Sequence, residues 1–511
     1  MALVGNILHG VLINRKNSLE KKQLNFNLQV KTLQALLQKA RNTRFGKDHV
    51  FGEILDNDDV VGEFRKNVPL YNYELLFSEY WHLLLEGKPD VTWPGKVKYF
   101  GLTSGTSNDS SKRVPITRDM IKSIRKIGIR QLLSLAELDL PPHFYESSIL
   151  MLGGSTSLIN MEKYFEGDLS GILAGRLPFW FNSFYKPGQI SKEKDWNTKL
   201  DKIVLKAKDW NIGGICGVPA WVQILLEKII DHYGLQNIHD LWPNFRVFAH
   251  GGVHFSPYRK SFEKLMGKEI HYLETYLASE GFLAYQRKKD RPMQLVLDNG
   301  IFFEFIPFNS SNFRPDGSLV KNPQVLLLDE VRENEDYALI ISTNAGTWRY
   351  LIGDTIKFTS VKDYEIVITG RTKHFLSLCG EHLSVDNMTS AISEIAEAMN
   401  IQIKEFTVAG IPFEKRFAHK WYIGTDDAIF DPQKLRDLLD QTLCKLNDDY
   451  AVERRAALKE VLVEIIQPKA FYEWLKMKGK EGGQHKFPRV IGNQYAEWNE
   501  FSRQYLNGHN N

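Results

Sequence analysis

The loop between Thr103 and Lys112 has the composition of a site that could bind a polyphosphate. It reads Thr-Ser-Gly-Thr-Ser-Asn-Asp-Ser-Ser-Lys and follows an alternating stretch, residues 97–100, that predicts a strand. A glycine lets backbone N–H groups turn toward an anion, the hydroxyl groups donate further hydrogen bonds, and the lysine adds a positive charge. The same composition is also typical of an ordinary surface turn, so a functional reading needs support from other segments.

Two further segments place a carboxylate beside a glycine. In residues 274–281, Glu280 is a hard oxygen ligand of the kind that binds Mg²⁺, and Tyr276 could stack on a base or close over an acyl pocket. In residues 347–354, Asp354 follows a glycine turn and offers two acceptor oxygens, which suits the two hydroxyls of a ribose. Taken singly, each segment would also fit a strand end or a turn.

Several common nucleotide and hydrolase motifs do not occur in the sequence. It contains no Gly-Lys-Ser/Thr of a Walker loop, no Gly-x-Gly-x-x-Gly, no His-Glu-x-x-His and no Gly-x-Ser-x-Gly. Adenylation remains as the common nucleotide chemistry that fits such a loop.

Together and in this order, the three segments resemble the GH3 family of acyl-amido synthetases, and in particular its bacterial-type, auxin-responsive promoter-like members. This family is a branch of the acyl-adenylate-forming superfamily, which includes acyl-CoA synthetases, luciferases and nonribosomal adenylation domains. The resemblance covers nearly the whole chain. It extends to these further segments: Thr43-Arg44-Phe45-Gly46-Lys47, Pro69-Leu70-Tyr71, Trp93-Pro94-Gly95, Gly153-Gly154-Ser155, Gly217-Val218-Pro219-Ala220-Trp221, His250-Gly251-Gly252-Val253 and Gln484-His485-Lys486-Phe487-Pro488-Arg489.

The resemblance implies a role for residues in each segment. It makes Glu280 the metal ligand and, with Lys486, a catalytic residue, Lys486 being similar to the superfamily's mobile lysine. It assigns ATP binding to Ser104, Gly105, Thr106, Ser107, Lys112, Gly251, Gly252, Tyr276, Ser279, Asp354 and Arg371. Within that set, Ser104–Ser107 would bind phosphates with Lys112 at the rim, Gly251 and Gly252 would lie against adenine, and Asp354 and Arg371 would bind ribose.

The implied activity uses ATP and Mg²⁺ to activate a small carboxylic acid as an acyl-adenylate. The acyl group then passes to an amine, with an amino acid as the expected acceptor, and the products are an amide, AMP and pyrophosphate. Such chemistry depends on positioning and on neutralising negative charge between two anions. The acid, the acceptor and the oligomeric state are not readable from the sequence.

Two positions depart from the family pattern and keep alternatives open. His382 stands where many relatives carry a lysine, and histidine is only partly charged near neutral pH, which gives Lys486 more weight as the active cation. Asp109 lies in the phosphate loop and would repel a phosphate unless it points away. The alternatives are an acyl-CoA synthetase-like ligase that forms a thioester and a non-catalytic nucleotide-binding module.

Composition limits the class of protein. The 511 residues are 43% hydrophobic and carry a formal net charge of only +3, so no whole-molecule field favours nucleic acid or anionic lipid. Three distant cysteines favour a reducing compartment over a disulfide framework or a zinc site. Residues 1–13 lack the pattern of a signal peptide, and no apolar run is long enough to span a membrane. We therefore expect a cytoplasmic protein whose first helix packs on its body.

Alternating helical and strand patterns predict the elements that hold these residues. Short apolar runs alternate with amphipathic helical stretches up to residue 266, and a strand-rich section follows as far as Ile368. We expect an α/β fold: a large N-terminal α/β domain with mixed sheets, residues 1–369, and a small mobile C-terminal α+β domain, residues 370–511. The segments that carry this prediction are helices at 24–39, 220–232, 258–266, 432–446 and 469–478, strands at 148–152, 212–216, 245–249, 406–410 and 421–424, and strand-rich stretches at 293–306, 324–329 and 337–343.

Overall fold

The computed structural model describes most of the chain and shows an α/β fold with mixed sheets, as predicted. The residues described are 25–103, 112–176, 184–251, 255–314, 317–372, 383–413, 416–428, 431–447, 450–451, 454, 458–480 and 486–509. The first helix expected near the N-terminus lies outside these ranges, as do Ser104 to Ser107, Asp109, Gly252 and His382.

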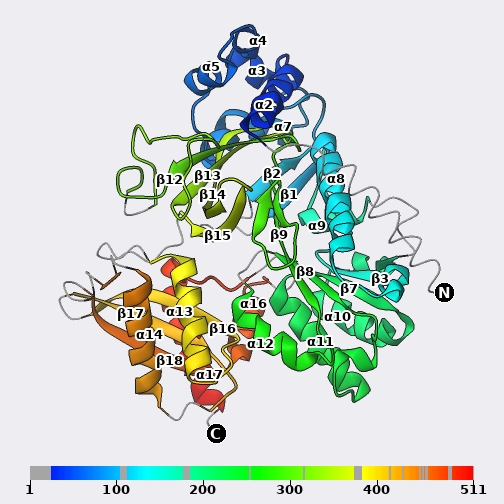
Figure 1. Cartoon of the computed structure of the whole chain (residues 1–511), viewed down its shortest axis with the longest axis vertical. Helices are drawn as coiled ribbons and strands as arrows, with labels where there is room; N and C mark the ends of the chain where they lie inside the picture. Colours follow the sequence, from blue (N-terminus) through cyan, green and yellow to red (C-terminus); the bar gives the residue numbers. More distant parts are fainter. Residues whose placement is uncertain are drawn as a thin grey trace.

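One long mixed sheet organises the large part of the molecule (Figure 1). Within the described residues it has 11 strands. From one edge to the other they are β12 (Ile301–Pro307), β13 (Asp336–Thr343), β14 (Thr347–Ser360), β15 (Glu365–Arg371), β11 (Met293–Leu295), β10 (Gly281–Gln286), β9 (His271–Ala278), β8 (Val247–Gly251), β7 (Ile212–Gly217), β3 (Ser148–Leu152) and β6 (Tyr185–Lys186). The strands from β9 to β6 are parallel and those from β12 to β9 are antiparallel, so the sheet changes type at β9.

Helices cover the parallel half of this sheet because their apolar faces have nowhere else to pack. Helix α11 (Pro219–Tyr233) starts with a proline at its first turn and ends at Gly234, whose left-handed conformation (φ 61°) suits a helix C-terminus. Its buried residues join α10 (Trp196–Lys206) and α12 (Ser256–Leu265) in one apolar cluster against β3, β7 and β8. Helices α8 (Arg118–Ser134) and α9 (Leu169–Ala174) contribute to a separate cluster near β10.

A group of short helices lies beyond the antiparallel half of the sheet (Figure 1). Its members are α2 (Phe26–Ala40), α3 (Arg44–Asp48), α4 (Phe51–Leu55), α5 (Val60–Asn67), α6 (Tyr73–Leu76) and α7 (His82–Leu85). Trp348 of β14 packs against the rings of Phe45, Phe51 and Phe64 from this group, with centroids 4.8 to 6.5 Å apart. This aromatic packing therefore holds β14, the strand that carries Asp354, against the group of helices.

A second, smaller sheet carries the predicted phosphate loop. It comprises β2 (Lys112–Ile116), β1 (Tyr99–Thr103), β5 (Phe165–Gly167) and β4 (Ile159–Asn160). Strands β1 and β2 are antiparallel, and Thr103 and Lys112, which flank the predicted loop, lie opposite each other.

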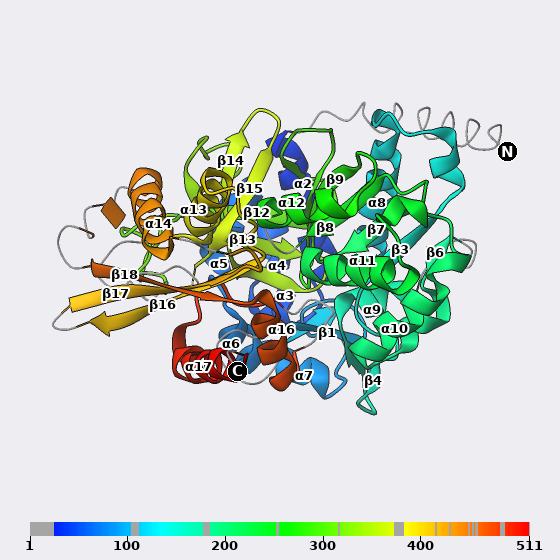
Figure 2. The same cartoon turned by 90° about the horizontal axis from the view of Figure 1, so that it is seen from below.

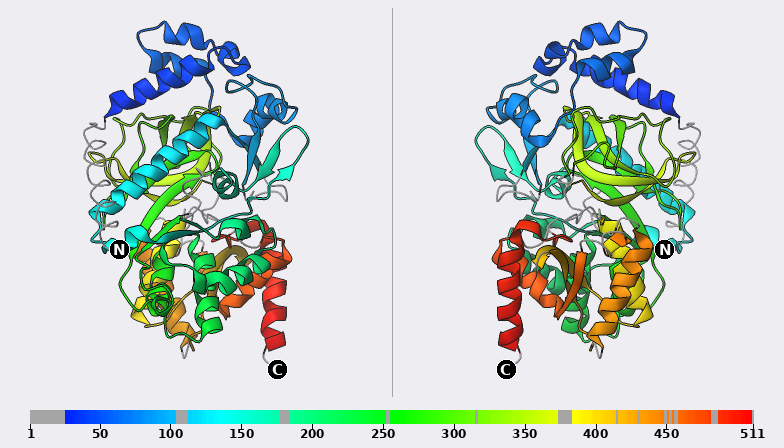
Figure 3. Two further views of the ribbon diagram at one scale, coloured as in Figure 1. Left: turned by 90° about the vertical axis from the view of Figure 1, so that its right-hand side faces the viewer. Right: turned by 90° about the vertical axis from the view of Figure 1, so that its left-hand side faces the viewer.

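The C-terminal part forms a three-layer unit. Its sheet contains β16 (Glu405–Phe413), β17 (Arg416–Gly424) and β18 (Leu458–Ile466). One face packs against α13 (Val385–Ala398) and α14 (Pro432–Leu446), and the other against α16 (Pro468–Met477) and α17 (Tyr495–His509). Figure 2 shows the sheet between these two helical layers, and Figure 3 shows α17 at the opposite end of the molecule from α2.

Within the ranges that the structure describes, no helix combines the length and apolarity needed to cross a membrane.

The prediction of a strand at residues 324–329 is wrong. Leu326 forms one isolated bridge with Phe305, and no strand extends from it. Pro323 lies directly before this stretch and has no N–H to donate to a ladder.

Candidate active site

Asp354 joins two other predicted site residues from separate strands. Its Oδ1 lies 2.8 Å from Nε of Arg371, which faces it across the β14–β15 ladder. Its Oδ2 accepts a hydrogen bond of 2.6 Å from the hydroxyl of Tyr276 in β9. The structure therefore brings Tyr276, Asp354 and Arg371 together around one carboxylate.

Backbone geometry places this carboxylate differently from the sequence prediction. Asp354 was expected after a turn, but β14 runs without interruption from residue 347 to residue 360. Gly353 has φ 89°, a backbone conformation that residues with a side chain rarely adopt. Its carbonyl accepts a hydrogen bond from the N–H of Thr372 at 2.8 Å. The glycine thus permits a local irregularity within the strand rather than a chain reversal.

The charge of Asp354 affects the protonation states of Arg371 and Tyr276. The negative charge of Asp354 raises the pKa of Arg371 further above its usual value, so the guanidinium stays charged. Burial, followed by the charge of Asp354, raises the pKa of Tyr276 well above its usual range. The phenol consequently stays protonated and remains a hydrogen-bond donor.

Glu280 lies nearby in the turn between β9 and β10 and is 7% exposed. Burial, with the charge of Asp354 adding to it, raises the pKa of this carboxyl to about 7, while Arg371 and Lys112 oppose the rise. Among the described residues, no basic side chain lies within ion-pair distance of Glu280. A cation bound there would relieve the cost of burying this charge.

Glu280 is a residue of this site that could bind Mg²⁺. No cluster of three or more histidine, cysteine or acidic residues that could hold a metal ion occurs in the described part of the chain. Magnesium usually binds through one or two carboxylates together with substrate phosphates and water. Glu280 as a single buried carboxylate matches that pattern.

Other predicted ATP-binding residues lie on the elements around Glu280. A Cβ atom at Gly101 of β1 would lie 3.7 Å from Cβ of Ser279, so the strand that leads into the phosphate loop passes beside Ser279. Lys112 at the far end of that loop lies 3.4 Å from Glu74 and sits over the ring of Tyr73. This lysine therefore lies against α6.

Gly251 ends β8 and pairs with Thr275 of β9 in parallel register. A Cβ atom at this position would lie 2.5 Å from the carbonyl oxygen of Thr275. Close packing of the two strands alone thus requires a glycine here. Because strand packing alone accounts for Gly251, the predicted contact of this residue with adenine stays a proposal.

Lys486 approaches the same place from the far end of the chain. The residue is exposed, yet surrounding protein removes enough water from its ammonium group to lower its pKa to about 8. The positive charges of Arg371 and Arg489 lower this pKa further, and the negative charge of Asp354 raises it. The charges of Asp354 and Arg371 on the large sheet thus act on Lys486 of the C-terminal unit.

The sequence interpretation gave no role to two residues in the segment of Asp354. Tyr350 is buried, and its pKa is raised well above the usual value by burial and then by the charge of Glu280. Arg349 is 5% exposed and forms a bidentate ion pair with Glu304, at 2.9 Å for both contacts. The sequence did carry a signal for this ion pair, because Arg349 and Glu304 are charged residues inside otherwise apolar strands.

Comparison with known proteins identifies relatives of this chain. The GH3 family N-terminal domain matches residues 16–207, the GH3 family central domain matches residues 294–371, and the GH3 family C-terminal domain matches residues 386–495. An indole-3-acetic acid-amido synthetase from Arabidopsis thaliana, GH3.15, is 24% identical over 213 residues, which are 38% of this chain and 36% of the relative. A jasmonoyl–L-amino acid synthetase from Nicotiana attenuata, JAR4, is 30% identical over 136 residues, which are 26% of this chain and 22% of the relative. The aligned part thus spans about a third or less of the length of these curated relatives.

Solved structures extend the similarity in fold to nearly the whole chain. The GH3.15 acyl acid amido synthetase superposes with a TM-score of 0.75 at 16% identity, covering 99% of this chain and 96% of that one. A 2-hydroxyisobutyryl-CoA ligase in the postadenylation state superposes with a TM-score of 0.59 at 13% identity, covering 94% and 91%. The fold is therefore that of adenylate-forming enzymes, and the three domain matches show that the chain belongs to the GH3 family.

Proposed function

We propose that this protein is an ATP-dependent ligase that activates a carboxylic acid as an acyl-adenylate and transfers the acyl group to an amine. The observation that carries the proposal is the meeting of Tyr276, Asp354 and Arg371 from three strands, with Glu280 beside them. Membership of a family whose named relatives are amido synthetases supports it.

On this proposal, Asp354 accepts hydrogen bonds from the ribose of ATP, and Arg371 and Tyr276 hold the carboxylate in place. The Tyr276 ring is buried in the core, which favours an orienting role over stacking on adenine. Ser104, Gly105, Thr106 and Ser107 would bind the phosphates, with Lys112 turning from Glu74 toward them. Gly251, Gly252 and Ser279 would line the adenine side.

Glu280 would hold Mg²⁺, and the bound ion would neutralise charge on the phosphate oxygens. The substrate carboxylate oxygen attacks the α-phosphorus of ATP, the bond to the bridging oxygen breaks, and pyrophosphate leaves. Lys486, when protonated, stabilises the negative charge that gathers between the two anions. An amine nitrogen then attacks the acyl carbon, AMP leaves with the electron pair of the broken bond, and the nitrogen loses a proton.

The acid and the acceptor are proposals drawn from the relatives. Two relatives are named for indole-3-acetic acid and for jasmonoyl conjugates with amino acids, and the GH3.15 enzyme has been solved in complex with 2,4-DB. We therefore propose a small organic acid and an amino acid acceptor. The bacterial-type assignment stays a prediction, since the two curated relatives described above come from plants.

We also propose that residues 1–369 and 370–511 act as two domains, with the smaller one turning between adenylation and transfer. The segment after Arg371 would be the pivot. Such a movement would exclude water from the reactive anhydride.

A trapping assay tests the activity. The protein is incubated with ATP, Mg²⁺ and hydroxylamine, together with 2,4-DB, indole-3-acetic acid or jasmonic acid, and hydroxamate and pyrophosphate are measured. We expect both products with at least one acid. Their absence across a broad acid panel, with ATP binding intact by calorimetry, would instead favour the non-catalytic module.

The thioester alternative keeps support from the fold shared with the 2-hydroxyisobutyryl-CoA ligase. AMP release separates the two reactions, since an amido synthetase responds to added amino acids and a thioester-forming ligase to coenzyme A. We expect stimulation by amino acids.

A further inference from the structure

A buried polar contact joins the C-terminal unit to the large part of the molecule, away from Asp354. Tyr258 of α12 donates its hydroxyl to Oε1 of Glu405 in β16 at 2.5 Å. A guanidinium nitrogen of Arg489 donates to Oε2 of the same carboxylate at 2.6 Å. Tyr258 and Glu405 are 2% and 4% exposed, so water competes little for these bonds.

Arg489 lies three residues after Lys486, and the backbone between them is tied to β16. The N–H of Val408 donates to the carbonyl of Arg489 at 2.9 Å, and the Thr407 hydroxyl donates to the carbonyl of Pro488 at 2.7 Å. The Arg489 guanidinium also lies over the ring of Phe406, 4.3 Å from its centroid. The segment that begins at Lys486 is therefore fixed to the strand that begins at Glu405.

Other polar contacts between the two parts are weaker. Lys404 lies 3.6 Å from Glu227, and Lys264 donates to Gln402 at 3.5 Å. Both contacts involve groups that are partly or largely exposed, and such contacts contribute little in water. The hydroxyl of Tyr258 stays protonated, because burial and the charge of Glu405 raise its pKa. It is thus a permanent donor to a buried carboxylate, which is the stronger class of hydrogen bond.

We propose that Tyr258 is a positioning residue for adenylation: its hydroxyl holds the Glu405–Arg489 pair, and with it the segment that begins at Lys486, against the large part of the molecule. The inference rests on the proposed function. The Glu405–Arg489 pair belongs to the C-terminal unit and stays intact when that unit turns, whereas the bond from Tyr258 must break. Tyr258 consequently stabilises the adenylating arrangement and not the transferring one.

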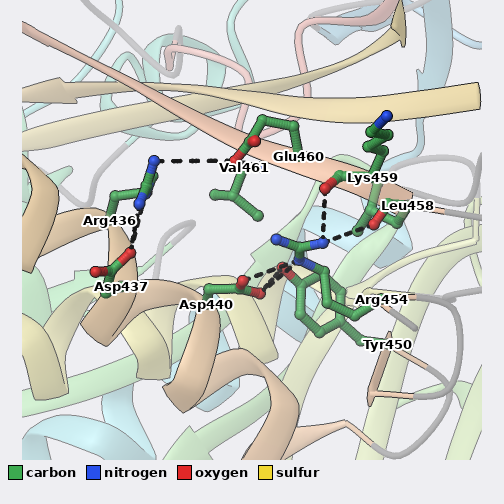
Figure 4. A network of polar contacts seen from close by, with 9 residues as sticks. All are labelled: Arg436, Asp437, Asp440, Tyr450, Arg454, Leu458, Lys459, Glu460 and Val461. Atoms are coloured by element: carbon green, nitrogen blue, oxygen red, sulfur yellow. Dashed lines mark hydrogen bonds and ion pairs between the residues drawn. The ribbon is translucent and has the colours of Figure 1, made fainter. Parts of the chain in front are cut away.

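The C-terminal unit contains a matched control (Figure 4). Tyr450 donates to Oδ1 of Asp440 at 2.8 Å, and Arg454 donates to the same carboxylate at 2.9 Å. This trio has the same chemistry as Tyr258, Glu405 and Arg489, but all three of its members lie in one unit. Tyr450→Phe therefore removes the same kind of bond without affecting how the two parts are held together.

The test compares Tyr258→Phe with Tyr450→Phe in the full-length protein after thermal unfolding shows that both fold. Adenylation is followed by ATP–pyrophosphate exchange with the acid that gives most hydroxamate in the wild type. Transfer is followed separately from the synthetic acyl-adenylate of that acid and an amino acid. For Tyr258→Phe we expect the kcat of exchange to fall about tenfold, the change expected when one hydrogen bond to a charged group is lost, with KM for ATP and the transfer rate unchanged. Tyr450→Phe should leave both half-reactions at the wild-type level.

A second measurement separates a loss of positioning from a general change in folding. Hydrogen exchange at the amides of residues 486–491 should become faster in Tyr258→Phe and not in Tyr450→Phe.

The outcomes separate the two proposals. If the wild type exchanges no pyrophosphate with any acid, the proposed function fails and this inference fails with it. If the wild type is active and Tyr258→Phe matches Tyr450→Phe, or slows both half-reactions equally, the positioning role alone is overturned.

Discussion

At the scale of single residues, one carboxylate organises the candidate site. Asp354 receives donors from β9 and β15, which are not adjacent in the sheet, and its charge also acts on Glu280 and Lys486. Few of these relations are local in sequence: 78 residues separate Tyr276 from Asp354. The role of each residue is therefore best tested by a substitution that changes the charge of the side chain and keeps its shape.

Asp354→Asn keeps the size of the side chain but removes its charge. An amide pairs poorly with Arg371 and can accept through one oxygen only, so ribose binding should weaken. We expect KM for ATP to rise about tenfold or more, in line with the loss of a hydrogen bond to a charged group. Steady-state pyrophosphate release measures this effect. Asp363→Asn, at an exposed ion pair with Arg291, serves as the control and should leave KM unchanged.

The pH dependence of adenylation should report on Lys486. Its pKa is lowered to about 8, chiefly because surrounding protein removes water from the ammonium group, with Arg371 and Arg489 adding to the effect. The ammonium is therefore charged below that pH and neutral above it. We expect the exchange rate to fall as pH rises through about 8, long before an ordinary lysine titrates. In Lys486→Arg the cation persists at high pH, so any activity that remains should lose this decline. A wild-type rate that stays constant across this range would contradict the assignment.

At the scale of elements, groups outside the site position β14, the strand that carries Asp354. Arg349 has φ 40° and is held by Glu304 and by the carbonyls of Arg65 and Val68, at 3.0 and 2.7 Å. The segment of Tyr71 pairs with β14 beside it, through the Tyr71 N–H and the Arg349 carbonyl. These contacts fix the start of the strand that carries Asp354.

Glu304→Gln should destabilise the protein strongly. It leaves the buried guanidinium of Arg349 without a charge partner, which costs about 3–5 kcal/mol in comparable cases. Urea unfolding followed by tryptophan fluorescence should show the transition at lower urea concentration. Glu335→Gln, at an exposed contact with Arg332, should leave the transition in place.

Two glycines give opposite predictions for the same substitution. Gly251→Ala would place a methyl group 2.5 Å from the carbonyl of Thr275, and overpacking of this kind typically costs about 1–3 kcal/mol. Gly52→Ala in helix α4 meets nothing within 4 Å and should stabilise by about 0.5–1 kcal/mol. Thermal unfolding of the two variants distinguishes a packing requirement from an ordinary glycine effect.

Elements with strong periodicity could be predicted from the sequence, and contacts between distant elements could not. The structure confirms the predicted helix Pro432–Leu446 and the strand Ser148–Leu152 with the same bounds, because a proline and a clear apolar pattern define them. The Asp354–Arg371 pair depends on the register of β14 and β15, which shifts at irregular points in the ladder. The contact of Tyr258 with Glu405 depends on how the C-terminal unit packs against the large part of the molecule, and neither residue has a local signal.

At the scale of the whole molecule, the candidate site takes residues from both parts of the chain. Tyr276, Asp354 and Arg371 lie on strands of the large sheet, and Glu280 lies in the turn between β9 and β10. Lys486 comes from the C-terminal unit. A ligand that occupies the site should therefore contact both. The proposed boundary at residues 369 and 370 falls within β15, which runs from Glu365 to Arg371.

A non-hydrolysable acyl-sulfamoyl adenosine tests this arrangement in the intact protein. We expect it to slow hydrogen exchange in β14 and β15 and at residues 486–491 together, since one bound molecule would lie against both parts. Adenosine alone, which lacks the phosphate-like linkage near Lys486, should protect the two strands and leave residues 486–491 at the unliganded rate. If the acyl-sulfamoyl adenosine protected the strands but left residues 486–491 at the unliganded rate, the shared site would be contradicted.

The geometry around Asp354 has a consequence for nucleotide selection. A carboxylate has about four lone-pair positions, and Tyr276 and Arg371 occupy one on each oxygen. The two that remain equal the number of hydroxyls on the sugar of ATP. A 2′-deoxy or 3′-deoxy analogue would leave one acceptor unsatisfied in a partly dry environment, and sites built in this way reject such analogues far more strongly than a missing methylene. The enzyme should thus distinguish ribonucleotides from deoxyribonucleotides without a dedicated steric gate.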